Sequence, residues 1–110
     1  MNERLTSGKQ YALLRTFKVC IENGGYVANL AKTLDDFIEA FDLNKEEAAC
    51  LQQLKKNLED AKPLTELFTD CEAFDKPVRF FLSLPAAVNV GRWETSFDLA
   101  LEYLNRFLVK

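Results

Sequence analysis

The sequence predicts an all-α fold, a compact single-domain bundle of five or six short antiparallel helices that takes up residues 1–110. Apolar residues recur three and four positions apart through most of the chain, which is the spacing of an amphipathic helix. Residues that start and stop helices separate these stretches at short intervals, and short connections favour antiparallel neighbours. With 48% hydrophobic and 28% charged residues, the composition is that of one globular domain with a single core.

The first two helices are expected on either side of a glycine pair. Residues 7–10 read Ser-Gly-Lys-Gln, a capping-box pattern that starts the first helix. Its apolar face begins at Leu13, and the Asn-Gly-Gly at residues 23–25 ends it. The second helix has the strongest periodicity in the chain, with apolar residues from Val27 to Phe41 on one face. Acidic residues lie on its other face and crowd its last turn, where they oppose the helix macrodipole.

A third helix is expected to start at Asn44, an N-cap residue that is followed three positions later by the acid Glu47. Its apolar seam is narrow, so this helix is expected to lie on the surface, with Asn57 among its polar residues. Pro63 separates it from a short fourth helix, whose apolar spacing continues to Phe74.

The C-terminal third begins at Asp75, which is placed to cap a short segment through Leu84. The apolar run at residues 78–84 fits a buried helix or a short strand, and we favour a helix because no other segment could pair with it as a strand. Residues 85–93 are expected to form an ordered loop. A capping-box pattern at residues 95–98 starts the last helix. Its apolar face is predicted to comprise Phe97, Ala100, Leu101, Leu104, Phe107 and Leu108.

The expected location is the cytoplasm. No apolar stretch approaches the roughly 20 residues that cross a bilayer, so no membrane partner is expected. The first eight residues lack the apolar core of a secretion signal. Three cysteines without Cys-x-x-Cys spacing, Cys20, Cys50 and Cys71, fit reduced thiols in the core better than disulfides.

The chain contains no histidine. It therefore lacks the commonest general base, the commonest metal ligand and every Ser-His or Cys-His nucleophile. Its glycine pair, Gly24 and Gly25, links two expected helices, whereas nucleotide-binding loops join a strand to a helix. We expect no cofactor, no metal and no enzyme activity. The alternative is a small histidine-free enzyme that uses carboxylates, such as Asp35 with Glu39, or a thiol.

Negative charge is concentrated in the middle of the chain. The net charge is −3, but residues 35–75 hold 12 acidic and 4 basic residues, a local charge of −8. Six of these acids lie within 13 residues around the junction of the second and third expected helices, and we name them the acidic junction: Asp35, Asp36, Glu39, Asp42, Glu46 and Glu47. Such charge asymmetry favours a partner of opposite sign, so the acidic junction is the first candidate for partner binding.

Arg92 and Trp93, in the expected loop, are the second candidate for partner binding, because Arg and Trp are enriched among interface hot spots. Exposed rings at Phe80 or Phe81 would form a patch that a homodimer could cover.

The sequence therefore predicts a non-catalytic protein-binding module, an adaptor or inhibitor. Direct binding of nucleic acid is not expected, because the basic residues of the first helix are few. The partner could itself be a basic nucleic-acid-binding protein. In that alternative the chain is an acidic mimic of nucleic acid, of the kind seen in phage anti-defence and anti-CRISPR inhibitors, an analogy that rests on fold and charge alone.

Overall fold

A computed structural model describes residues 5–22, 27–60, 62, 66–88 and 93–108. These residues contain the helices α1 (Ser7–Glu22), α2 (Val27–Ala40), α3 (Lys45–Cys50), α4 (Gln52–Glu59), α5 (Lys76–Val88) and α6 (Trp93–Leu108), and the described part of the chain has no strand. The predicted all-α fold is confirmed, and residues 78–84 are helical. None of the described helices is long and apolar enough to cross a bilayer.

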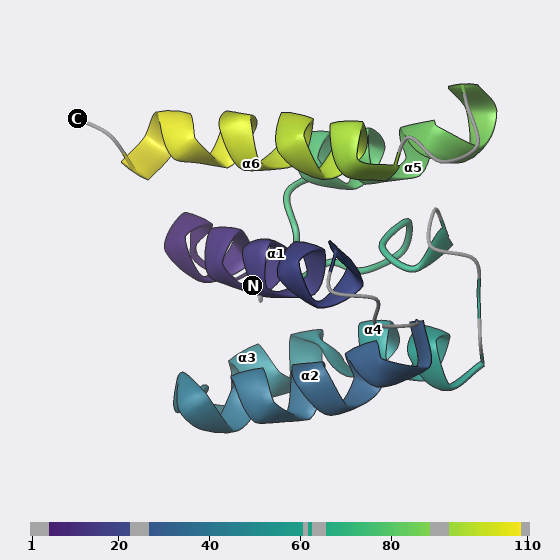
Figure 1. Cartoon of the computed structure of the whole chain (residues 1–110). Coiled ribbons are helices and arrows are strands. Elements are labelled where there is room, and N and C mark those ends of the chain that lie inside the picture. Colours follow the sequence, from purple (N-terminus) through teal and green to yellow (C-terminus); the bar gives the residue numbers. More distant parts are fainter. Residues whose placement is uncertain (1–4, 23–26, 61, 63–65, 89–92, 109–110) are drawn as a thin grey trace.

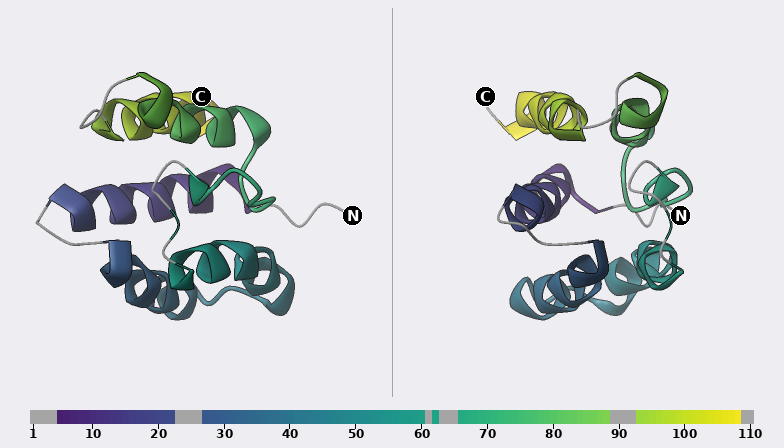
Figure 2. Two further views of the ribbon diagram at one scale, coloured as in Figure 1. Left: turned by 90° about the vertical axis from the view of Figure 1, so that its right-hand side faces the viewer. Right: turned by 45° about the vertical axis from the view of Figure 1, so that its right-hand side comes forward.

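The helices form three layers. Figure 1 shows α1 between a layer of α5 and α6 and a layer of α2, α3 and α4, and both views in Figure 2 keep this order. Helix α1 packs against α6 on one side and against α2 on the other. The pairs α1/α2 and α5/α6 run in opposite directions, as expected for helices joined by short connections. The Cα radius of gyration is 12.9 Å, the value of a compact domain of this length.

Phenylalanine and leucine fill the centre of the molecule. The ring of Phe68 has less than 2% of its surface exposed and lies between three other rings. Its centroid is 5.4 Å from that of Phe74, 6.2 Å from that of Phe97 and 6.2 Å from that of Phe17. Two of these contacts are edge-to-face, the geometry that the ring quadrupole favours. The aromatic centre thus joins α1 and α6 to the segment between α4 and α5.

The predicted fourth helix is wrong within the described residues 66–75. This segment makes successive tight turns, in which Cys71 N donates to Phe68 O and Phe74 N donates to Cys71 O. Each bond spans three residues, so buried side chains recur at nearly helical spacing although no α-helix forms. In Figure 2 the segment lies beside α1 in the middle layer. Its apolar residues are therefore buried, as predicted, in a different backbone conformation.

Asn57 holds this segment against α4. The sequence placed Asn57 on the surface, but its side chain is fully buried. Its Nδ2 donates to Leu67 O at 2.8 Å and to Asp70 Oδ1 at 3.0 Å, and its Oδ1 accepts from Gln53 at 2.9 Å. The predicted third helix is also divided, because Leu51 N bonds to Ala48 O three residues back and separates α3 from α4.

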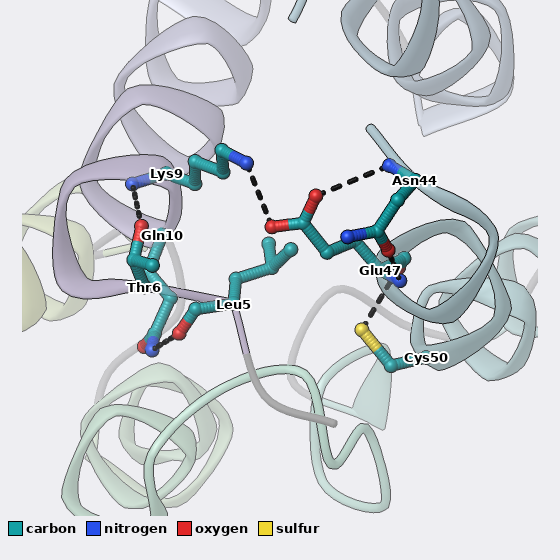
Figure 3. A network of polar contacts seen from close by, with 7 residues as sticks. All are labelled: Leu5, Thr6, Lys9, Gln10, Asn44, Glu47 and Cys50. Atoms are coloured by element: carbon teal, nitrogen blue, oxygen red, sulfur yellow. Dashed lines mark hydrogen bonds and ion pairs between the residues drawn. The ribbon is translucent and has the colours of Figure 1, made fainter. Parts of the chain in front are cut away.

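The N-terminal end of α1 differs from the predicted capping box. Thr6, and not Ser7, is the cap: its Oγ1 accepts from Lys9 N and its carbonyl from Gln10 N. Gln10, expected to complete the box, is instead buried, and its Nε2 donates to Leu5 O at 2.7 Å (Figure 3) and to Asp75 Oδ1 at 3.4 Å. Asp75 N donates back to Gln10 Oε1. Gln10 therefore joins the start of the chain to the start of α5.

The predicted loop at residues 85–93 is wrong at both ends. Helix α5 continues through Pro85 to Val88, and α6 begins at Trp93, two residues before the predicted capping box. Residues 89–92 lie outside the described residues. The apolar face of α6 is buried from Phe97 to Leu104, but Phe107 and Leu108 near its end are exposed. The apolar pattern of α6 therefore extends about one turn beyond the part of the helix that is buried.

Candidate functional site

The acidic junction is built around the C-terminal end of α2. The chain leaves the helix by a Schellman turn, in which Leu43 N donates to Ile38 O and Asp42 N to Glu39 O. Asp42 takes the left-handed position of this turn, with φ of 49°, where glycine or asparagine is the usual residue. The turn leads within two residues to Asn44, so the last acids of α2 and the first acids of α3 lie close in the chain.

Glu47 is engaged in holding the fold together. It forms the predicted capping box with Asn44: Glu47 N donates to Asn44 Oδ1 at 2.8 Å, and Asn44 N donates to Glu47 Oε1 at 3.2 Å. Its second carboxylate oxygen accepts from Lys9 Nζ at 2.7 Å, which links α3 to α1 (Figure 3). The bond from Lys9, followed by that from Asn44, lowers the pKa of Glu47 below its ordinary value.

Two further acids of the junction are paired with lysines. Asp35 Oδ1 lies 3.2 Å from Lys55 Nζ of α4, and Asp36 Oδ2 lies 3.1 Å from Lys32 Nζ one turn earlier in α2. Both acids are exposed. Because solvent screens such pairs, each contributes little to stability, on the order of 0.5 kcal/mol. They nevertheless reduce the negative charge that a partner would meet.

Glu39, Asp42 and Glu46 make up the open part of the acidic junction. All three are exposed, and none forms an ion pair with a residue that the structure describes. Phe41 lies among them in the chain with 45% of its surface exposed, and its ring stacks on the buried ring of Phe37 at a centroid distance of 4.3 Å. The last residue of the predicted apolar face, Phe41, therefore lies just beyond the end of α2 and is exposed to solvent.

The second candidate for partner binding, Arg92 and Trp93, lies only partly within the described residues. Arg92 lies outside the described residues, and Trp93 is the first residue of α6. Helix α6 belongs to the layer on the far side of α1 from the α2–α3 junction (Figure 1). A partner that engages the acidic junction therefore approaches the opposite layer of the molecule from the one that contains Trp93.

A partly exposed row of aromatic rings lies on α5 and α6. The sequence indicated a patch at Phe80 or Phe81, but it placed Phe107 on the apolar face of the last helix. Phe80 is 61% exposed and Phe107 is 53% exposed. Neighbouring ring centroids in the row Phe80, Phe81, Tyr103 and Phe107 are 5.9, 6.2 and 5.1 Å apart. The sequence contains a signal for Phe80, because it lies two residues from Val78 and from Leu82, which share the buried face of α5.

The cysteines and carboxylates are the side chains that could bind a metal ion or act as a nucleophile. The described residues contain no group of three or more Cys, Asp or Glu side chains placed to hold a metal ion. Burial raises the pKa of the Cys71 thiol to about 12, which opposes the thiolate that a nucleophile needs. Glu59 and Asp60 line an open groove on α4 together with Lys55 and Lys56, and both acids are exposed to solvent.

No protein-family model, curated protein or solved structure matches this chain.

Proposed function

We propose that the chain is a non-catalytic protein-binding module, an adaptor or inhibitor, that engages its partner through the α2–α3 junction. The exposed pair Phe41–Asp42 is the observation that carries this proposal. An aromatic ring anchored on a buried ring, with open acids beside it in the chain, has the composition of an interface anchor with a polar rim. The matching partner surface is an apolar pocket rimmed by lysine and arginine.

Asp42 supports the proposal because stability alone disfavours an acid at this position. A left-handed backbone favours glycine or asparagine, and the negative end of the α2 dipole favours a cation. Together these effects destabilise the fold by about 0.5–1 kcal/mol relative to glycine. An acid at this left-handed position costs stability, and a role in binding would account for that cost.

A mimic of nucleic acid is a narrower form of the same proposal. A mimic would present an extended row of uncompensated charges to a phosphate-binding groove. In this chain Asp35, Asp36 and Glu47 each pair with a lysine of the same molecule, which leaves three open acids at the junction within the described residues. The general binding module therefore stands ahead of the mimic, and a basic nucleic-acid-binding protein remains one type of partner.

Capture of partners on the immobilised full chain tests the proposal. One variant replaces the open acids by their amides, Glu39→Gln with Asp42→Asn and Glu46→Gln. A second variant is Phe41→Ala. The matched control removes three exposed acids elsewhere, Glu59→Gln with Asp60→Asn and Glu66→Gln, and so changes the net charge equally.

A partner that is retained by the wild type and the control but lost from both junction variants supports the proposal. Raising the ionic strength should weaken capture by the wild type and reduce its difference from the acid variant, because salt screens the rim charges. A partner retained equally by all four proteins would contradict it. If the partner is lost from Phe41→Ala but kept by the acid variant, the role of the aromatic anchor is supported and the role of the acids is overturned.

A further inference from the structure

A second surface lies at the start of α5, in the layer opposite the acidic junction (Figure 1). An open groove of about 370 Å³ is lined there by Thr69, Lys76, Arg79, Phe80 and Ser83, and we name it the α5 groove. Its volume is in the range of small-molecule sites. The described residues that line it include two cations and no acid, although the chain as a whole is acidic.

Lys76 and Arg79 lie one turn apart on α5, and neither forms an ion pair with a described residue. Two cations at this spacing repel each other, so their neighbourhood is unfavourable when nothing lies between them. The acids Glu72 and Asp75 line a second groove, whose lining also includes Lys76 and Arg79. The backbone N and the side chain of Asp75 both bond to Gln10, which holds this acid toward α1.

The guanidinium of Arg79 is incompletely bonded. Its Nε is buried and has no hydrogen-bond partner among the described residues. A buried donor without a protein partner is uncommon in folded proteins. An oxyanion in the α5 groove would pair with the guanidinium of Arg79, which favours bidentate contacts to carboxylate and phosphate.

We propose that the α5 groove binds an oxyanion, a carboxylate or a phosphate monoester, attached to a planar apolar group. Lys76 and Arg79 hold the anionic oxygens. The apolar group lies against the ring of Phe80, which is exposed at the same groove. The hydroxyl proton of Ser83 is donated to Phe80 O at 2.7 Å, so this serine borders the site without donating to the ligand.

Titration of the ¹⁵N-labelled full chain with small probes tests this site by NMR. The probes are phenyl phosphate, phenylacetate, inorganic phosphate and benzylamine. We expect the two aryl anions to shift the amides of residues 69–83 saturably and to move the Arg79 Nε–H signal in the direction of hydrogen bonding. Whichever aryl anion binds more tightly identifies the anionic group. Benzylamine, which carries the opposite charge, should cause no saturable shift.

Variants separate the site from non-specific attraction. Lys76→Gln and Arg79→Gln should each weaken binding of the preferred aryl anion about tenfold, because each removes a charge-assisted hydrogen bond. Lys56→Gln, which removes an exposed cation from α4, should leave it unchanged. Lys76 is exposed, so its variant tests the site even if Arg79→Gln fails to fold.

Shifts that never saturate, or that persist unchanged in Lys76→Gln, would overturn the site. Equal affinity for inorganic phosphate and phenyl phosphate would overturn the role of Phe80. The described residues that line the α5 groove include none from α2 or α3, so these outcomes are independent of the function proposed for the acidic junction.

Discussion

Replacing Asn57 tests the unexpected element of the fold, the turn segment at residues 66–75. Asn57→Ala removes two bonds donated to that segment and one accepted from Gln53. It also leaves the carbonyl of Leu67, a fully buried residue, without the partner that Asn57 supplies. The substitution therefore weakens the attachment of a core segment to α4, although the Asn57 side chain is small and uncharged.

The expected loss of unfolding free energy is about 2–4 kcal/mol. The part-buried bonds to Gln53 and Asp70 contribute about 0.5 kcal/mol each, and the buried carbonyl of Leu67 left unpaired costs about 1–3 kcal/mol. This is a large part of the 5–15 kcal/mol that typically stabilises a domain. Asn57→Asp should be at least as damaging near neutral pH, because a carboxylate would then face Leu67 O and the carboxylate of Asp70.

Urea denaturation followed by circular dichroism at 222 nm measures this loss. Gln53→Ala is the matched control, since it removes only the outer bond to Asn57 Oδ1 and should cost about 0.5–1 kcal/mol. The reasoning is refuted if Asn57→Ala lies within about 0.5 kcal/mol of the wild type, or if the two variants lose the same amount.

Three further predictions concern single residues. Glu47→Gln should destabilise the fold at pH 7, and the difference from wild type should disappear as the pH falls below 4.5, because the folded-state pKa of Glu47 is lowered and the carboxylate contributes only while ionised. A difference that is independent of pH would contradict this. With Cys20 and Cys50 replaced by serine, Cys71 should react with a thiol reagent at pH 8 on the order of 1,000-fold more slowly in the native than in the denatured chain, because burial raises its pKa from 9.0 to about 12. Similar rates would show that the segment opens freely. Pro85→Ala should stabilise the chain by about 1 kcal/mol or more, because alanine restores an amide hydrogen inside α5; a lower melting temperature would count against a helix that continues past residue 84.

Features set by neighbouring residues could be predicted from the sequence, and features set by distant partners could not. The capping box of Asn44 and Glu47 spans three residues and was found, and so were the apolar faces of α2 and α6. The same reasoning placed Asn57 on the surface, because its partners Leu67 and Asp70 lie 10 and 13 residues away. A polar residue is predicted to be exposed whenever the partner that it bonds to in the core is too far away in the sequence to appear in the local pattern.

The candidate site shows the same limit. The six acids were identified from their crowding in the chain, and five of them are exposed. That Glu47 belongs to the fold follows from Lys9, which lies 38 residues away on α1. The exposure of Phe41 and Phe107 could not be read from periodicity, because a helical stripe does not show where the covering helix ends. Asp42 carries a weaker signal, since a residue between a helix and a new N-cap often takes a left-handed conformation.

The substitution Asp42→Gly tests most directly the claim that the α2–α3 junction is kept for binding at a cost in stability. Glycine relieves the left-handed backbone and removes one open acid. We predict a gain of about 0.5–1 kcal/mol in unfolding free energy together with slower association and weaker binding to the partner recovered by capture. Greater stability with unchanged or tighter binding would contradict the account, because Asp42 would then be dispensable to the surface that is proposed to need it.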